Sequence, residues 1–163
     1  MVALNSKHLI LRTSWVYAAR GGNFAKTMLR LAVERDTLTV INDQFGAPTS
    51  AEVLADVTTH AIRALQANPE LAGLYHCVAA GETSWHGYAQ FVLQQAQELG
   101  YSLKAGSENV AETSTANYPT PAKRPLNSRL DTSKLRAAFG LSLPHWQQGV
   151  ARMLTEISGK SST

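Results

Sequence analysis

The chain has 163 residues, of which 44% are hydrophobic and 17% are charged, a composition typical of a soluble globular protein with one domain or a large piece of a bigger one. Its formal net charge is +3, but the basic residues are scattered and form no run, so nucleic acid is not an expected partner. The mild positive excess suits a small anionic ligand such as a diphosphate. No apolar run approaches the ~20 residues of a membrane span, and the first residues do not resemble a signal peptide. We therefore expect a cytoplasmic protein with no membrane partner.

The first residues alternate between strand and helix patterns. A short apolar run over 9–11 is typical of a buried strand. Apolar side chains recur at helical spacing over 24–35, and Asn23 precedes them as a helix cap. The β-rich residues 37–41 predict a second strand, and the turn residues of 42–49 predict a loop.

The same alternation continues in the middle of the chain. A helix is predicted over 51–66, with Thr49 or Ser50 as its cap. A third strand is predicted over 73–79, followed by a helix over 85–99.

The last third begins with the longest irregular stretch, 101–125, which is rich in Ser, Thr, Asn, Pro and Ala. Loops of this length are usually binding elements or disordered. A helix over 131–139 with an Asp131 cap follows, and then a helix over 144–157 with proline in its first turn.

Strands that alternate with helices predict an α/β fold with a mostly parallel sheet. Only three strands are convincing, and three strands make an incomplete sheet with an exposed edge. We therefore expect part of the sheet to lie outside this chain.

Several kinds of catalytic site are missing from the sequence. Cys77 is the only cysteine and lies in an apolar run, which is typical of a buried thiol. The five histidines have neither i,i+4 spacing nor cysteine partners, so a zinc site is not expected. There is no G-x-G-x-x-G turn for a dinucleotide. No tyrosine is followed by a lysine four residues later, the pair with which short-chain reductases exchange a proton.

Three side chains that follow predicted strands or end the irregular stretch could bind a ligand. Trp15 offers a flat apolar face and one N–H donor to a sugar or nicotinamide ring, or else packs in the core at the margin of the sheet. Gln44 offers a donor and an acceptor to a base edge, or else stabilises its loop. Arg124 offers a fork that matches a diphosphate, or else is a solvated surface charge.

Two further positions could bind an anion. Pro48 and Thr49 lie at a predicted helix start, where free backbone N–H groups favour an anion, although capping is the more common use. Lys26 could do similar work beside Asn23, although such a lysine is more often exposed to solvent.

Six segments resemble one known family in the order of that family. They are RTSWVY (12–17), NFAKTM (23–28), INDQFGAPT (41–49), GLYH (73–76), YPTPAKRP with NSRL (118–130) and RMLTE (152–156). Together they resemble the C-terminal half of the dTDP-4-dehydrorhamnose reductases, which are extended short-chain dehydrogenases. The resemblance implies NADPH- or NADH-dependent reduction of dTDP-4-dehydro-L-rhamnose to dTDP-L-rhamnose, a donor for bacterial surface polysaccharides.

The resemblance also implies substrate-binding roles for four residues of this chain. Trp15 matches the family tryptophan at the sugar. Asn23, Gln44 and Arg124 match positions at which such enzymes hold the nucleotide diphosphate.

Four more residues are implied at a cofactor or a metal. Thr13 and Ser14 would lie near the nicotinamide. Glu52 and Glu156 match positions that could contribute to a Mg²⁺-assisted contact in a homodimer, since carboxylates suit this hard cation, or else both are simply solvated.

The implied architecture is the C-terminal part of a Rossmann-type parallel sheet with a small, mostly helical substrate-binding region. Residues 1–41 would supply late Rossmann strands and a helix, and residues 42–163 mainly the sugar-nucleotide-binding region. The cofactor-binding half and the catalytic Tyr–Lys pair would lie outside, so the chain alone is expected to be inactive. The alternatives are a non-catalytic nucleotide-sugar-binding or regulatory subunit on the same scaffold, or an enzyme that acts on another nucleotide sugar.

Overall fold

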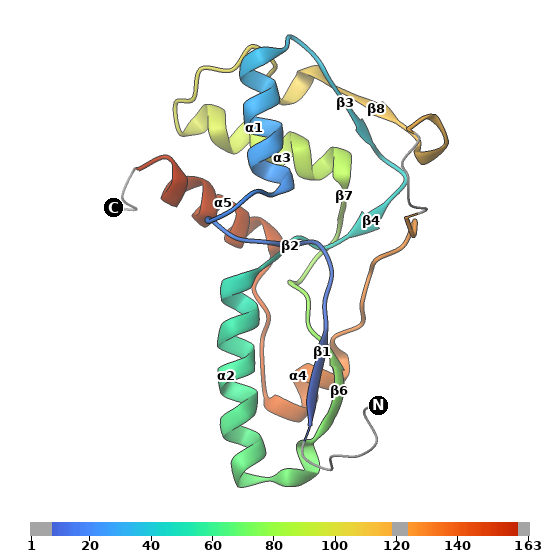
Figure 1. The fold of residues 1–163 in the computed structure, drawn as a ribbon, viewed down its shortest axis with the longest axis vertical. Helices are drawn as coiled ribbons and strands as arrows, with labels where there is room; N and C mark the ends of the chain where they lie inside the picture. Colours follow the sequence, from blue (N-terminus) through green and yellow to red (C-terminus); the bar gives the residue numbers. More distant parts are fainter. Residues whose placement is uncertain (1–7, 119–123, 160–163) are drawn as a thin grey trace.

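Residues 8–118 and 124–159 are described by a computed structural model (Figure 1). Residues 119–123, in the middle of the segment YPTPAKRP, lie outside the described residues. The α-helices are α1 (Phe24–Glu34), α2 (Ala51–Ala67), α3 (Trp85–Glu98), α4 (Ser133–Phe139) and α5 (Trp146–Ile157). The strands are β1 (Leu9–Arg12), β2 (Val16–Tyr17), β3 (Leu38–Ile41), β4 (Phe45–Gly46), β5 (Thr49–Ser50), β6 (Gly73–His76), β7 (Thr83–Ser84) and β8 (Val110–Thr113). Within these described ranges, no helix combines the length and the apolar character needed to cross a membrane.

The strands form short pairs, and the mixed α/β class with parallel pairing is confirmed. β1 pairs with β6, β2 with β5 and β3 with β8, all in parallel, whereas β4 and β7 are antiparallel. β3 pairs with β8 and not with β1 or β6, and the division of the chain at residue 41 into late Rossmann strands with a helix and a sugar-nucleotide-binding region stays a prediction. In Figure 1 these two pairs lie at opposite ends of the molecule.

Within the predicted irregular stretch 101–125, the described residues 101–118 contain more secondary structure than their composition indicates. They contain β8 and two 3-10 helices, Ser107–Asn109 and Thr115–Asn117. Only Val110 of β8 is buried, so no alternation of apolar and polar residues marks this strand in the sequence. Its backbone pairing with β3, and not its side chains, makes it a strand.

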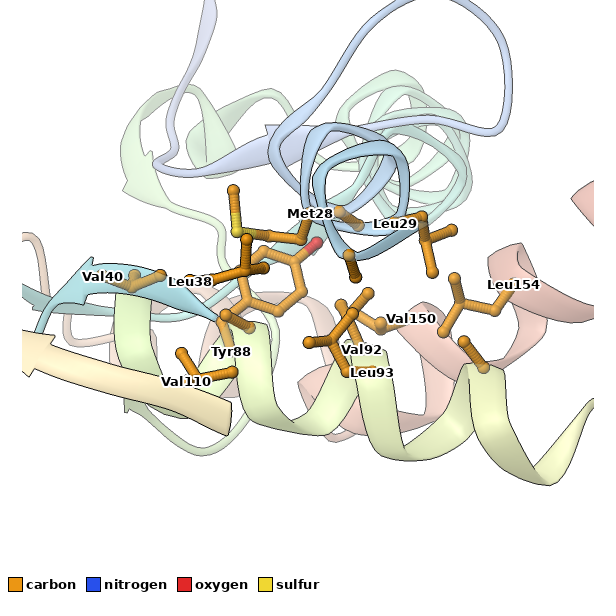
Figure 2. Packing of buried hydrophobic residues seen from close by; sticks show 14 of the residues in the cluster. Met28, Leu29, Leu38, Val40, Tyr88, Val92, Leu93, Val110, Val150 and Leu154 are labelled. Carbon is orange, nitrogen blue, oxygen red and sulfur yellow. The ribbon is translucent and has the colours of Figure 1, made fainter. Parts of the chain in front are cut away.

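Two buried clusters support this arrangement. The first, which we call the upper cluster, joins α1, α3 and α5 with β3 and β8 (Figure 2). Its members include Met28, Leu29, Val40, Tyr88, Leu93, Val110, Val150 and Leu154. The second, the lower cluster, consists of Val57, Ala61, Tyr75, Cys77, Leu135, Phe139 and Leu143. The boundary between the two clusters does not coincide with residue 41 of the sequence, because residues on both sides of Ile41 belong to the upper cluster.

β1 is less buried than a central strand of a complete sheet. Leu9 and Leu11 pack against the lower cluster, yet all of Leu9, Ile10 and Leu11 stay only partly buried. Side chains alternate along a strand, which places Ile10 on the other face. Among the described residues β1 pairs with β6 alone, so its second edge is open.

Local side-chain hydrogen bonds begin the helices largely where the sequence predicts. Asn23, Ser50 and Ser84 each accept a bond from the backbone N–H three residues later, at the starts of α1, α2 and α3. The last two helices start later than predicted. α4 follows Thr132, while Asp131 accepts bonds from Ser133, and Pro144 precedes the His145 cap of α5 instead of lying in its first turn.

Thr49 joins three segments of the chain at the junction between the clusters. Its side chain is fully buried. Its hydroxyl donates to the carbonyl of Ala47 at 3.0 Å and accepts from the N–H of Ala79 at 3.1 Å. Its own N–H donates to the carbonyl of Trp15 at 3.1 Å, so this N–H is not free for an anion. A hydroxyl of this size at this place satisfies polar groups that no water reaches.

We expect Thr49→Val to lower the free energy of unfolding by about 1–3 kcal/mol, because the valine keeps the volume but leaves the buried N–H of Ala79 without an acceptor. Chemical denaturation measures the change. Thr49→Ser is the matched control, since it keeps the hydroxyl. Equal losses in both variants would show that packing, and not the hydrogen bonds, carries the effect.

Candidate functional site

A cavity of about 670 Å³ lies beside the upper cluster. Its wall includes Trp15, Phe24, Gln44, Trp85, Tyr118 and Arg124. Volumes of this order are typical of small-ligand sites, which are mostly apolar with a few polar groups. Three of the four predicted substrate-binding residues, Trp15, Gln44 and Arg124, therefore lie on one cavity although they are far apart in sequence.

The aromatic wall of the cavity is a stack of rings. The rings of Trp15 and Trp85 are parallel to within 16°, with centroids 3.8 Å apart. The ring of Phe24 packs against Trp85, with 4.6 Å between the two ring centroids. The two tryptophan rings cover each other's facing sides, and the apolar ring surface that they leave toward the cavity suits a ring-containing ligand such as a sugar or a base.

The backbone at Trp15 is held in a conformation that bulky residues rarely adopt. Its φ is +50°, in the left-handed region. Gly46 permits the position of the ring, because a Cβ at Gly46 would lie 2.8 Å from Trp15 Cε2. Such strain persists where surrounding structure enforces it, and it concentrates at binding sites.

Gln44 is buried and its amide is already bonded within the protein. The Nε1–H of Trp85 donates to Gln44 Oε1 at 3.2 Å, and Gln44 Nε2 donates to Thr115 Oγ1 at 3.1 Å. One N–H and one lone pair of the amide remain for a ligand. Gln44 thus fixes the ring of Trp85 as well as facing the cavity.

Asp43 anchors the other end of this network. Its carboxylate accepts from the hydroxyl of Thr115 at 2.6 Å and from the backbone N–H of Thr115 at 2.9 Å. The hydrogen bond from the Thr115 hydroxyl, and then the bond from the Thr115 N–H, lower the pKa of Asp43 below its ordinary value. The ionised carboxylate is therefore the form that holds Thr115 against Gln44.

Arg124 supplies positive charge at the exposed rim of the cavity. Its side chain is exposed and forms no hydrogen bond or ion pair with the described residues. It is the first residue of a segment, residues 124–130, that forms backbone hydrogen bonds with Phe45 of β4. An exposed guanidinium on the lining of a cavity can offer its fork to a diphosphate.

The other predicted binding residues lie elsewhere. Asn23 caps α1 with its Oδ1, and its Nδ2 donates to the carbonyl of Ala18 at 2.7 Å, so both ends of the amide have partners away from the cavity. Lys26 donates to the carbonyls of Ala19 and Gly21 and closes the same loop. Thr13 and Ser14 follow β1, and Ser14 Oγ donates to the carbonyl of Ser128 at 3.1 Å.

The predicted metal ligands do not form a metal site within the described residues. No group of three or more His, Cys, Asp or Glu side chains in this part of the chain could hold an ion. Glu52 instead lies 3.6 Å from Arg152 in an ion pair that links α2 to α5. An ion shared between two copies of the chain would take ligands from both, and Glu52 and Glu156 stay a prediction for that case.

Cys77 is buried, as the sequence predicts. Burial raises the pKa of its thiol to about 11, so the thiol is neutral and a poor nucleophile near pH 7.

Sequence patterns did not point to Phe24, Trp85 or Tyr118 as parts of the cavity. Phe24 and Trp85 fit the apolar faces of helices, which gives them a sufficient role in the core. Both are the first residues of their helices, and this position beside a loop was the available signal. Tyr118 is 51% exposed, and only its place at the end of the long stretch distinguishes it.

The sequence profile of the RmlD substrate binding domain matches residues 1–158 of this chain. The chain belongs to this family. A dTDP-4-dehydrorhamnose reductase of Shigella flexneri is 60% identical over 152 residues, which cover 93% of this chain and 50% of that protein. The enzyme of the same name from Salmonella typhimurium is 61% identical over 151 residues, with the same two shares. The chain thus spans about half the length of the curated relatives that it matches.

Solved structures confirm the fold of the RmlD substrate binding domain. A dTDP-4-dehydrorhamnose reductase ortholog of Clostridium acetobutylicum matches with a TM-score of 0.80 at 31% identity, covering 95% of this chain and 50% of that one. The reductase of Bacillus anthracis, solved in complex with NADP, matches with a TM-score of 0.74 at 33% identity, covering 91% and 48%. The family resemblance and its restriction to half of the family's length are both confirmed.

We expect Asp43→Asn to lower the melting temperature at pH 7 and to have a smaller effect at pH 3. The folded pKa of Asp43 lies below the unfolded one, so the ionised carboxylate stabilises the fold above the unfolded pKa, near 4, and this contribution is lost as the pH falls through the folded pKa. Thermal melts at the two pH values measure it. Asp56→Asn, on the exposed face of α2, is the control, and an effect of Asp43→Asn that is independent of pH would contradict this account.

Proposed function

We propose that this chain is the sugar-nucleotide-binding half of a dTDP-4-dehydrorhamnose reductase, which reduces dTDP-4-dehydro-L-rhamnose to dTDP-L-rhamnose for surface polysaccharides. One observation carries the proposal: in a member of the RmlD substrate binding domain family, Trp15, Gln44 and Arg124 converge on one cavity of about 670 Å³. Relatives that are 60% and 61% identical carry the name of this enzyme.

The cavity offers separate surfaces to the parts of a dTDP-sugar. The stacked rings of Trp15 and Trp85 line the cavity and offer their remaining apolar surface to a sugar or a base. Arg124, at the exposed rim, offers a charged fork to the diphosphate. The amide of Gln44 has one donor and one acceptor left for the substrate. Separate surfaces for the ring and for the diphosphate account for a cavity that is mostly apolar and has the charge of Arg124 at its rim.

The cofactor in this proposal is NADPH or NADH, which supplies the hydride in such enzymes. The sequence has no Gly-rich phosphate turn, so this chain would touch the cofactor only through residues after β1, with Thr13 exposed there and Ser14 bonded to Ser128. The pair β1–β6 would continue the dinucleotide-binding sheet across the open edge of β1. A cytoplasmic homodimer is the corresponding proposal for location and assembly.

A second candidate function is a non-catalytic nucleotide-sugar-binding subunit. The lack of both a Gly-rich turn and a Tyr-x-x-x-Lys pair in the 163 residues favours it. The protein sequence encoded immediately upstream distinguishes the two: a Gly-rich turn with Tyr-x-x-x-Lys there supports the reductase, and neither motif supports the subunit.

We expect the chain alone to give no turnover of the keto sugar with NADPH above background, because the proton-transferring Tyr–Lys pair is missing from it. Loss of NADPH absorbance at 340 nm measures turnover. Turnover that depends on this chain would contradict the proposal that it binds the sugar nucleotide but lacks the catalytic residues.

We expect dTDP to raise the melting temperature of the chain more than UDP does, because ligand that binds only the folded state stabilises it. At 100 times the dissociation constant the gain is about 2.7 kcal/mol. Arg124→Ala should reduce this gain, whereas Arg63→Ala, on the exposed face of α2, should not. A cooperative melt that dTDP does not change would remove the nucleotide site from this cavity.

A further inference from the structure

Residues 124–130, which we call the Arg124 segment, are held against β4 by backbone hydrogen bonds. The N–H of Phe45 donates to the carbonyl of Leu126 at 2.9 Å, and the N–H of Ser128 donates to the carbonyl of Phe45 at 2.8 Å. Asn127 forms a parallel bridge with Phe45. The hydroxyl of Ser14 also donates to the carbonyl of Ser128, at 3.1 Å. Arg124 lies at one end of this segment, and Arg129 lies near the other end.

Arg129 closes the segment from its other end. Its guanidinium carbon lies 4.7 Å from the centroid of the Phe45 ring. Its Nε and Nη2 donate to the two carboxylate oxygens of Glu82, at 2.5 Å and 3.2 Å. A planar fork that meets both oxygens fixes direction as well as distance, which a lysine would not do.

The fork joins three separate parts of the fold. Glu82 lies in the loop between β6 and β7, Phe45 lies in β4, and Arg129 lies in the Arg124 segment. The two charged side chains remain 58% and 42% exposed, and exposed ion pairs contribute little to overall stability. Loss of this ion pair should therefore change the position of the Arg124 segment and have little effect on the stability of the fold.

We propose that the Glu82–Arg129 fork, stacked on Phe45, is a positioning device that holds Arg124 where the cavity meets the diphosphate of a nucleoside diphosphate ligand. The inference rests on the proposed function, because that function assigns the diphosphate to Arg124. Without the fork the segment samples more positions, and binding must then order it. Arg124 touches the ligand, and Glu82 and Arg129 act through it.

The test uses the full 163-residue chain and isothermal titration with dTDP and with thymidine, which lacks the diphosphate. Glu82→Gln removes one half of the fork, and Arg129→Lys keeps the charge without the fork. We expect both to weaken dTDP binding by about three- to tenfold and to leave thymidine binding unchanged. The matched control is Glu34→Gln, the same change in an exposed pair, since Arg30 and Glu34 are 3.2 Å apart on α1 and lie outside the Arg124 segment.

A double-mutant cycle separates positioning from general damage to the fold. In an Arg124→Ala background, Glu82→Gln should weaken dTDP binding no further, because the residue that it positions is gone. Additive losses in the double variant would overturn the proposal. Equal weakening of dTDP and thymidine would overturn it as well, since that result indicates a change in the whole cavity.

Hydrogen exchange keeps the inference testable even if the unchanged chain binds no dTDP, a result that would count against the proposed function. The Ser128 amide should then exchange faster in Glu82→Gln than in the unchanged chain or in Glu34→Gln, because its bond to Phe45 opens more often. Unchanged exchange at Ser128 would overturn the positioning role independently of any ligand.

Discussion

The buried hydroxyl of Thr49 is the interaction on which the rest of the structure depends. It binds the carbonyl of Ala47 and the N–H of Ala79, while the N–H of the same residue binds the carbonyl of Trp15. These bonds connect the chain after β1, the chain after β6 and the start of α2. Because the side chain is fully buried, water cannot replace any of these partners. Ala79 belongs to the upper cluster and Cys77 to the lower one, so the chain passes from one cluster to the other beside Thr49.

The aromatic wall of the cavity follows from that junction. With its carbonyl held by Thr49, Trp15 adopts a φ of +50° and its ring stacks on Trp85. Gly46 leaves room for the ring, and Gln44 fixes Trp85 through its indole N–H. A strained residue is thus kept in place by contacts on several sides, so the wall is already formed before any ligand arrives.

The sequence singled out Trp15 and Gln44 because each follows a predicted strand, and the family resemblance joined Arg124 to them. The three residues do converge on one cavity, but not at the edge of one sheet, because the strands before Trp15 and Gln44 belong to different pairs. The sequence did not predict that Asn23 serves its own helix cap and the Ala18 carbonyl, since an asparagine before a helix fits either role. β8 escaped notice because a short, mostly exposed strand has no apolar period. The fork from Arg129 to Glu82 spans 47 residues, and no local pattern carries such a pairing.

The pairing of β1 with β6 affects the cavity through the two loops that follow these strands. β1 and β6 pair in parallel with Arg12 opposite His76, so Trp15 and Glu82 follow neighbouring strand ends. One residue builds the aromatic wall and the other holds the segment that bears Arg124. Any strand added at the open edge of β1 would stiffen this pair and, with it, both sides of the cavity. The sugar-nucleotide binding proposed for this cavity is therefore tied to the sheet, even though the apolar wall of the cavity belongs to the upper cluster.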